Sequence, residues 1–437
     1  MLKSKKKLLL LLIPVVLVVL LVGTYCTLRF GFSIDIFDQS GWESKNSTIR
    51  YLDYYGNPLL KWQDIDGKRY YFSADTGDMC TEWQDIDGKR YYFNKDGILQ
   101  TGWLNLDNKT YYLDQNGELS FGWQEIDLQK FYFGADGAMT VGWQNIDSAL
   151  YYFDENGAPA IGWKELDGNR YLFSENGEAV TGWHSEDDGK YFFADDGKMQ
   201  TGWLDWEQKR YYFADSGVLT TGWLEMDGDR YYFGEDGRMA IGEVKIDGVS
   251  RFFTSKGKYV IMPNPWHPVP EDYETDMVDI DGYQFDRNGR DALKAMMDAC
   301  TDAGYYCGIN NTYRSYNTQK YMWDVRIERR MNEGMTYEEA CAYTARSVAL
   351  PGHSEHQTGL AVDVNTSDAG KAWLAEHCWE YGFILRYPDG KRPVTGIIFE
   401  PWHYRYVGTE LSLEMQELGL CMEEYMAMLT EQQTNIT

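Results

Sequence analysis

The sequence predicts a multi-domain protein with an N-terminal transmembrane helix, a solenoid of β-hairpin repeats and a C-terminal α+β domain. Three observations support this prediction. An apolar run follows a lysine-rich start, tryptophan recurs about every 20 residues, and four of the six histidines follow residue 350. At 437 residues the chain is also longer than one hydrophobic core usually supports.

The composition excludes several classes of protein. Lys and Arg number 41 against 68 Asp and Glu, for a net charge of −27. Because such a surface repels phosphate, we expect no nucleic-acid partner. Aromatic residues make up 16% of the chain, which is typical of folded rather than disordered sequences. Seven Cys are too few for a disulfide scaffold, and their pairing stays open.

Residues 1–29 are expected to form a basic cytoplasmic start and a single-pass membrane anchor. The apolar run from Leu8 to Gly23 reaches the length of a membrane span when the mild segment up to Leu28 is added. No small-residue cleavage site follows, and Tyr25 is too bulky for one. These features favour an uncleaved anchor over the alternative, a cleaved signal. The positive-inside rule then places everything after Arg29 outside the cytoplasm.

Residues 41–262, which follow a linker at 30–40, repeat with a period of about 20 residues. An aromatic triplet such as Tyr70-Tyr71-Phe72 and then a glycine follow most of the periodic tryptophans. Asp66-Gly67 and similar pairs are typical of tight hairpin turns, although some units replace the pair, for example with Ser148-Ala149, so we do not expect this turn to be uniform. Since one hairpin cannot bury its aromatic rings alone, neighbours must stack into a solenoid. Trp stands at 42, 62, 83, 103, 123, 143, 163, 183, 203 and 223, and Glu243 takes the next slot.

The period, the Gly-Trp step and the Tyr-Tyr-Phe triplet together resemble the cell-wall-binding repeats of Gram-positive surface proteins, a family that includes choline-binding modules and clostridial toxin repeats. The resemblance implies ligand sites between consecutive repeats, where Trp and Tyr faces attract a quaternary ammonium. The candidate wall-ligand residues are Trp103, Trp123, Trp143, Trp163, Trp183, Trp203, Trp223, Tyr112, Tyr132, Tyr152, Tyr212 and Tyr232.

The residue before the tyrosine pair does not decide which ligand the repeats bind. Choline-binding members commonly carry an aromatic residue there, and its loss removes one wall of the cage. Choline-decorated teichoic acid and a glycan therefore remain alternative wall polymers, and single rings serving only as solenoid core are a third interpretation. This chain has Arg69, Arg90, Arg170, Arg210 and Arg230 at this position, with Leu150 and Lys190 elsewhere.

A Pro-rich linker at residues 263–274 separates the repeats from a domain at 275–437, whose tail we expect to be helical. Within this domain, residues 360–364 alternate as in a strand, and Asp363 lies among apolar neighbours. A buried carboxylate requires a partner, and Gly359 permits a sharp turn that brings His356 near Asp363.

His403 follows forty residues later, within Glu400-Pro401-Trp402-His403. Two imidazoles and one carboxylate, from His356, His403 and Asp363, make a three-ligand zinc site with a fourth position left for water. The nearby carboxylate of Glu400 fits the base that such a water needs. Ser315 is expected to cap a helix that holds Gln319 near Arg314.

These elements resemble the zinc D,D-carboxypeptidases of the VanY type, within the wider group of lysostaphin-like, D-Ala-D-Ala-cleaving and hedgehog-like peptidases. The motif Ser-x-His-x-x-Gly-x-Ala-x-Asp runs from Ser354 to Asp363 and Glu-Pro-Trp-His-x-Arg from Glu400 to Arg405, while Tyr-Arg-Ser…Gln runs from Tyr313 to Gln319. The resemblance covers about residues 275–408. It implies Zn²⁺ bound by His356, Asp363 and His403, Glu400 as general base, Arg314 facing the oxyanion, and Gln319 and Ser354 holding substrate.

Together these features predict a wall-tethered zinc D,D-carboxypeptidase that removes the C-terminal D-alanine from peptidoglycan stem peptides. We expect it at the cell membrane, with its domains facing the cell wall. An L,D-carboxypeptidase acting on tetrapeptide stems is the alternative enzyme, because the same ligands serve both reactions. A non-catalytic wall-binding surface protein is the alternative from another class, and intact Glu400 and Arg314 argue against it.

Overall fold

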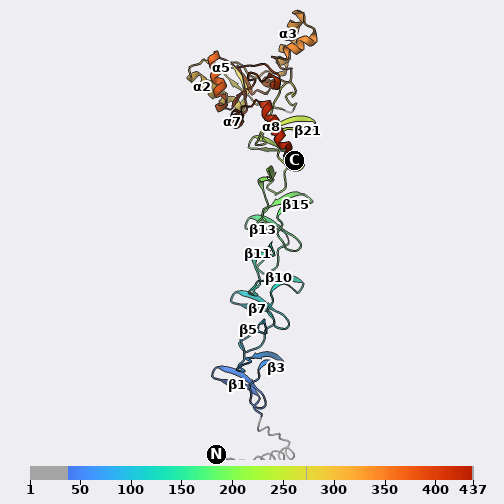
Figure 1. Cartoon of the computed structure of the whole chain (residues 1–437), viewed down its shortest axis with the longest axis vertical. Coiled ribbons are helices and arrows are strands. Elements are labelled where there is room, and N and C mark those ends of the chain that lie inside the picture. Colours follow the sequence, from blue (N-terminus) through green and yellow to red (C-terminus); the bar gives the residue numbers. More distant parts are fainter. Residues whose placement is uncertain (1–37, 272, 436–437) are drawn as a thin grey trace, which may run out of the picture. The chain divides into compact units, whose positions relative to one another are not determined.

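The computed structural model describes residues 38–271 and 273–435. The chain divides into two compact units, Met1–Val180 and Thr181–Thr437 (Figure 1). The membrane anchor expected at residues 1–29 lies outside the described residues. Among the helices that are described, none has both the length and the apolar character needed to cross a membrane.

The first unit is a series of two-stranded antiparallel hairpins of five-residue strands, which follow one another in chain order (Figure 1). Each hairpin pairs a tryptophan with the middle residue of the aromatic triplet, as in Trp62 opposite Tyr71. The strands are β1 (Gly41–Lys45), β2 (Thr48–Leu52), β3 (Lys61–Ile65), β4 (Lys68–Phe72), β5 (Glu82–Ile86), β6 (Lys89–Phe93), β7 (Gly102–Leu106), β8 (Lys109–Leu113), β9 (Gly122–Ile126), β10 (Gln129–Phe133), β11 (Gly142–Ile146), β12 (Ala149–Phe153), β13 (Gly162–Leu166) and β14 (Asn169–Phe173).

Most of the hairpin turns share one backbone shape although their sequences differ, and the turn at Asp187 and Asp188 is an exception. Asp66 and Gly67 both adopt positive φ, at 50° and 76°, as the turns of two-residue hairpins require. Where the glycine is missing the left-handed shape persists, for example at Leu128 with φ 67°. In the repeat for which Ser148-Ala149 is expected to form the turn, the turn falls on Asp147 and Ser148 instead.

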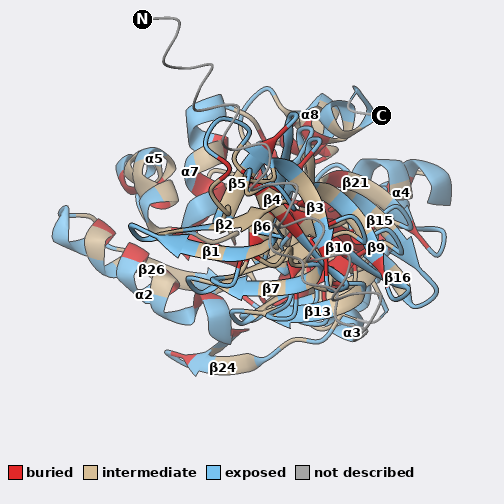
Figure 2. Cartoon of the chain, turned by 90° about the horizontal axis from the view of Figure 1, so that it is seen from below, coloured by how far each residue is buried: buried red, intermediate tan, exposed pale blue. Residues whose placement is uncertain are grey.

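The core of the repeats is built from the triplets. Figure 2 colours the chain by burial, and along strands such as β4 exposed residues give way to buried ones. The third aromatic of the triplet is fully buried, as at Phe72 and Phe93. Trp62 contacts the edges of Tyr71 and Tyr91, with ring centroids 5.1 and 5.0 Å apart, and so joins one repeat to the next. Rings that pack across repeats explain why a single hairpin would not suffice.

In the second unit the hairpins continue and then meet an α+β domain. The repeat strands here are β15 (Gly182–Glu186), β16 (Gly189–Phe193), β17 (Gly202–Trp206), β18 (Lys209–Phe213), β19 (Gly222–Met226), β20 (Asp229–Phe233), β21 (Gly242–Ile246), β22 (Val249–Phe253) and β23 (Tyr259–Val260). The last three strands form one sheet in the order β21-β22-β23, which ends the array.

The α+β domain has a four-stranded antiparallel sheet in the order β26-β27-β29-β28, together with a β24-β25 hairpin. Its strands are β24 (Met277–Ile280), β25 (Tyr283–Asp286), β26 (Gly308–Asn311), β27 (Ala361–Asn365), β28 (Phe383–Leu385) and β29 (His403–Tyr406). Its helices are α2 (Arg287–Asp302), α3 (Tyr316–Asn332), α4 (Tyr337–Thr344), α5 (Asp368–His377), α6 (Arg392–Thr395), α7 (Thr409–Leu418) and α8 (Met422–Asn435), with 3₁₀ turns η1 (Glu355–Thr358) and η2 (Cys378–Tyr381). The expected helical tail is confirmed, and α8 extends to Asn435.

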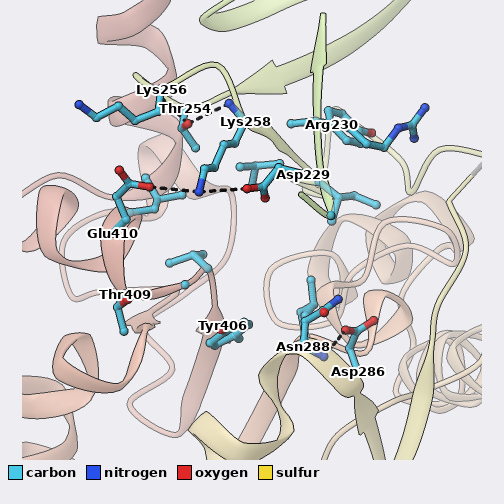
Figure 3. A pocket seen from close by; sticks show the side chains of 18 of the residues that line it. Asp229, Arg230, Thr254, Lys256, Lys258, Asp286, Asn288, Tyr406, Thr409 and Glu410 are labelled. Carbon is cyan, nitrogen blue, oxygen red and sulfur yellow. Dashed lines mark hydrogen bonds and ion pairs between the residues drawn. The ribbon is translucent and has the colours of Figure 1, made fainter. Parts of the chain in front are cut away.

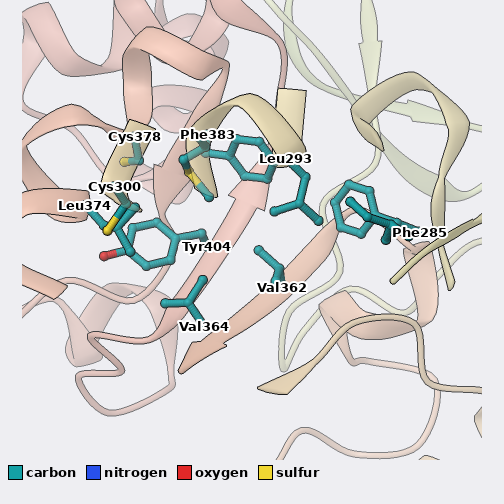
Figure 4. Packing of buried hydrophobic residues seen from close by; sticks show 11 residues of the cluster. Phe285, Leu293, Cys300, Val362, Val364, Leu374, Cys378, Phe383 and Tyr404 are labelled. Carbon is teal, nitrogen blue, oxygen red and sulfur yellow. The ribbon is translucent and has the colours of Figure 1, made fainter. Parts of the chain in front are cut away.

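One face of the sheet packs against α2 and α5. Figure 4 shows Val362, Val364 and Tyr404 of β27 and β29 directed into a buried cluster with Leu293 of α2 and Leu374 of α5. The alternation predicted for residues 360–364 is therefore confirmed for Val362 and Val364. Because side chains alternate across a strand, Asp363 lies on the opposite face.

Helix α8 joins the last repeat to the α+β domain. The backbone N–H of Glu243 donates to Oγ1 of Thr430 at 2.7 Å, and Gly242 lies so close to α8 that a Cβ atom there would meet the Thr430 nitrogen at 2.4 Å. Glu243 is the residue that replaces the periodic tryptophan. The helix thus packs against the repeat in which glutamate stands at the tryptophan position, and this repeat is the last of the array.

A hollow of about 970 Å³ lies at the same junction (Figure 3). Lys258 crosses it, with its Nζ 3.1 Å from Asp229 of β20 and 3.3 Å from Glu410 of α7. Charged residues of both signs line this hollow, and the ion pairs join the last repeats to the α+β domain.

Candidate metal centre

Three side chains converge on the sheet face opposite the apolar core. Asp363 of β27 and His403 of β29 are direct cross-strand partners. His356 lies in η1, and Gly359 ends that turn with φ 76°, a left-handed shape that favours glycine and leads the chain into β27. The turn expected at Gly359 is confirmed, and it brings His356 over Asp363.

The distances within this group are short. Nδ1 of His403 lies 2.9 Å from Oδ1 of Asp363, and Nε2 of His356 lies 3.2 Å from Oδ2. The other ring nitrogen of His356, Nδ1, lies 2.6 Å from the carbonyl oxygen of Thr312, which orients the imidazole. Asn311 donates to Oδ2 of Asp363 at 3.4 Å.

Burial sets the protonation states. Desolvation lowers the pKa of His356, so its imidazole is neutral and its lone pair is available. Burial alone would raise the pKa of Asp363, but the hydrogen bonds from His356 and His403 outweigh it and hold that pKa well below its usual range. A carboxylate beside two imidazoles is thus the stable state of the group.

The donor set fits zinc. One candidate ligand atom from each of His356, Asp363 and His403 lies within 4.8 Å of the others, and all three residues are at most 9% exposed. Nε2 of His403 is buried without a hydrogen-bond partner within the described part of the chain. Imidazole nitrogens and one carboxylate are the ligands of catalytic zinc sites, which keep a further position open. No other group of this kind was found among residues 38–271 and 273–435.

Glu400 lies at the edge of the group. Its Oε2 is 3.9 Å from Nδ1 of His403, and its backbone N–H donates to Tyr387 at 3.2 Å. Burial raises the pKa of Glu400 to about 7, with the charge of Asp363 acting in the same direction and His403 and Arg314 opposing it. A carboxyl group with a pKa near neutrality can both accept and return a proton.

Arg314 and Gln319 form a second cluster beside the first. Ser315 caps α3 by accepting from Thr318, and Gln319 accepts a 2.8 Å hydrogen bond from Arg314. The expected cap and the proximity of Gln319 to Arg314 are both confirmed. Gln319 also donates to the carbonyl of Ala349 at 2.6 Å, which fixes its amide.

The Arg314 backbone N–H donates to the carbonyl of His356 at 3.0 Å, which ties the two clusters together. Ser354 is buried next to them, and its side chain makes no capping bond to η1. Burial lowers the pKa of Arg314, and the positive charge of the exposed Arg326 of α3 acts in the same direction. The same charge opposes the rise in the pKa of Glu400.

A buried ion-pair network beneath the site was not predicted. Glu355 is fully buried between Arg386, whose Nε donates to it at 2.9 Å, and Arg405, which also donates to it. Arg386 binds Glu423 of α8 as well, with contacts of 2.6 and 2.9 Å. The strand period offered a signal, since Arg405 lies two residues after His403 and therefore on the same sheet face.

The candidate wall-ligand residues of the repeats differ in how far they are exposed. The tyrosines are half-buried and contact their own repeat's tryptophan edge-on, as in Trp103 and Tyr112 at 5.1 Å. The tryptophans differ in exposure: Trp103, Trp123, Trp143 and Trp183 are 36–43% exposed, whereas Trp163, Trp203 and Trp223 are half-buried. The pairs of Trp123, Trp143, Trp203 and Trp223 with Tyr132, Tyr152, Tyr212 and Tyr232 have the same edge-on contact.

Comparison with known families agrees with this division of the chain. Residues 283–409 match the family model described as VanY, D-alanyl-D-alanine carboxypeptidase. A choline-binding repeat model matches residues 80–120, 121–161, 180–221 and 220–261, and a model for putative cell-wall-binding repeats matches 61–79 and 161–179.

Individual relatives cover parts of the chain. A D-alanyl-D-alanine carboxypeptidase of Enterococcus faecalis is 36% identical over 174 residues, 38% of this chain and 65% of the relative. The chain spans 38–65% of the length of the curated relatives that it matches. A VanY D,D-pentapeptidase from a VanB-type resistance cassette, solved with Zn(II), is 36% identical over 38% of this chain and 97% of that one, with a TM-score of 0.36. CbpJ of Streptococcus pneumoniae is 27% identical over 57% of this chain and 99% of that one, with a TM-score of 0.45.

Proposed function

We propose that this chain, whose C-terminal domain belongs to the VanY family of D-alanyl-D-alanine carboxypeptidases and whose preceding segment carries choline-binding repeats, is a wall-bound zinc D,D-carboxypeptidase. It removes the C-terminal D-alanine from peptidoglycan stem peptides. The observation that carries the proposal is the convergence of His356, Asp363 and His403 beside the buried carboxyl of Glu400.

His356, Asp363 and His403 would hold the zinc ion. When bound, zinc supplies a lowered water pKa and polarises the scissile carbonyl. Glu400 takes the proton of the attacking water on its carboxylate and returns it to the leaving amine of D-alanine.

Arg314 supplies the fixed positive charge. Its guanidinium stays protonated at any working pH, and Gln319 holds one end of it at 2.8 Å. In this proposal it faces the oxygen on which negative charge develops, where a preorganised donor lowers the barrier. Gln319 and Ser354 position the terminal D-alanine against it.

The repeats hold the enzyme on its substrate polymer. We propose that they bind choline-decorated wall polymer, which the choline-binding repeat match supports. Attachment to the same polymer whose peptides are cut raises the effective substrate concentration. In this proposal residues 1–29 anchor the chain in the membrane, and the later domains face the wall. The domains are a linker at 30–40, the repeats at 41–262, a second linker at 263–274 and the peptidase domain at 275–437.

The test uses full-length protein, zinc-loaded or chelated, with muropeptides that carry pentapeptide or tetrapeptide stems. Mass spectrometry quantifies the released D-alanine. Zinc-dependent release from pentapeptide alone is expected, and Glu400→Gln serves as the matched inactive control. Release from tetrapeptide would establish the L,D-carboxypeptidase instead. A folded protein that neither retains zinc nor releases D-alanine would be a wall-binding protein without catalysis.

A further inference from the structure

Five of the repeat tryptophans carry an arginine from their own hairpin over the indole ring. The arginine is the residue just before the aromatic pair, on the strand opposite the tryptophan. Its Cζ atom lies between 4.5 and 5.2 Å from the ring centroid, within the range of a cation–π contact. The pairs are Trp62 with Arg69, Trp83 with Arg90, Trp163 with Arg170, Trp203 with Arg210, and Trp223 with Arg230.

A carboxylate accompanies every one of these arginines. The residue two positions after the tryptophan is acidic and is the direct cross-strand partner of the arginine, as in Asp85 opposite Arg90. The same holds for Asp64, Glu165, Asp205 and Glu225. Their ion pairs include one of 2.8 Å between Arg210 and Asp205 and one of 3.9 Å between Arg69 and Asp64. An acidic residue thus faces the arginine from the opposite strand in each of these five repeats.

The other five tryptophan repeats lack this arrangement. Ile49, Thr110, Lys130, Leu150 or Lys190 stands where the arginine would be, and in the described residues no cation lies over the rings of Trp42, Trp103, Trp123, Trp143 and Trp183. Exposure follows the same division without exception. These five tryptophans are 36–46% exposed, whereas the five beneath an arginine are all half-buried.

The two classes are otherwise built alike. Trp83 contacts Tyr92 and Tyr111 edge-on at 5.1 and 5.2 Å. Trp103, one repeat later, contacts Tyr112 and Phe131 edge-on at 5.1 and 5.0 Å. The ring is therefore fixed in the same way in both classes, and the guanidinium is the feature that separates them.

We propose that the arginines are internal occupants of the ring-face sites, so that the repeats fall into closed repeats (Trp62, Trp83, Trp163, Trp203, Trp223) and open repeats (Trp42, Trp103, Trp123, Trp143, Trp183). Only the open repeats bind the wall ligand, a quaternary ammonium of the choline type. This inference rests on the proposed attachment to choline-bearing wall polymer.

Charge and chemistry both favour a cationic ligand. In the closed repeats the ring face already accepts a soft, weakly hydrated cation, so the same face in an open repeat suits a quaternary ammonium. The protein as a whole carries a net charge of −27, which attracts cations and disfavours anionic ligands. A ring face that holds a guanidinium cannot hold a second cation at the same time.

The experiment exchanges the arginine and its acidic partner between two adjacent repeats of the full-length, zinc-loaded protein. The closing variant Asn105→Asp/Thr110→Arg installs the acid and arginine beside Trp103. The opening variant Asp85→Asn/Arg90→Thr removes them beside Trp83. Isothermal titration with choline counts the sites, circular dichroism verifies folding, and D-alanine release from pentapeptide monitors the peptidase domain.

We expect five choline sites in the unaltered chain, four in the closing variant and six in the opening variant, with D-alanine release unchanged. Lys130→Ala, in an open repeat, should leave the count at five. Choline binding with an unchanged count in both exchange variants would overturn the inference while leaving the proposed wall attachment intact. No choline binding by any folded variant, or binding of a wall glycan in its place, would overturn the proposed ligand and the inference together.

Discussion

Replacing Glu355 by glutamine should destabilise the peptidase domain more than any exposed charge change in the second unit. The carboxylate is fully buried between the guanidinium groups of Arg386 and Arg405. Removing its charge leaves two buried cations of which Arg386 alone keeps a second carboxylate, Glu423 at 2.6 Å. Breaking a buried ion pair from one side costs about 3–5 kcal/mol, which for a domain of this size corresponds to roughly 6–20 °C in Tm.

The assay is differential scanning calorimetry of the zinc-loaded protein. The release of zinc identifies which thermal transition belongs to the peptidase domain. Asp276→Asn is the matched control. Asp276 forms an exposed ion pair with Arg287 at 2.6 Å in the same unit, and the substitution removes the charge of its carboxylate. Exposed pairs contribute little, so that control should melt like the unaltered protein. A Glu355→Gln protein whose Tm falls by no more than the control's would refute the reasoning.

The loss of stability caused by Glu355→Gln should depend on pH in a direction that the pKa of Glu355 determines. Burial would raise the pKa of Glu355, but Arg405 and Arg386 outweigh it and hold the pKa below its usual value. The stabilisation is therefore fully present above the unfolded pKa of about 4.3 and is lost as pH falls through the lower folded pKa. The stability gap between the two proteins should stay constant above about pH 5 and narrow only in stronger acid.

Three further predictions concern the site and the thiols. Glu400→Gln should lower kcat for D-alanine release by about 10²–10⁴-fold while zinc content stays at one per chain, and retained activity would remove Glu400 from proton transfer. Arg314→Lys keeps the charge but loses the fork that binds Gln319, so kcat should fall by about 10²–10³-fold with zinc retained; an unchanged kcat would contradict an oxyanion role. Burial raises the pKa of Cys307 to about 12, and the thiol of Cys300 acts on this pKa in the same direction, which indicates that the two thiols are close together. In protein recovered from outside the cell we expect a disulfide between them, and a non-reducing peptide map that finds both as free thiols would contradict this.

Local patterns explain what could be predicted. The period of the tryptophans and the Asp-Gly turns determine the hairpins, because each hairpin forms between residues fewer than 15 positions apart. The cap at Ser315 and the turn at Gly359 are local in the same way. The donor types in the two histidine motifs identify a metal site before their positions are known, since few other roles suit two imidazoles and a carboxylate together.

The sequence by itself therefore determined the repeat, the strand alternation around Asp363 and the chemistry of the metal group. Only the tertiary structure decided how Glu355, Arg386, Arg405 and Glu423 pair, and that α8 packs on the last repeat through Thr430. It also decided that an arginine lies over five of the ten periodic indole rings. The physical reason is the same in each case. Whether a charged or polar group stabilises the folded state depends on the groups around it. Those groups come from distant segments, or from side-chain directions that the spacing of residues does not specify.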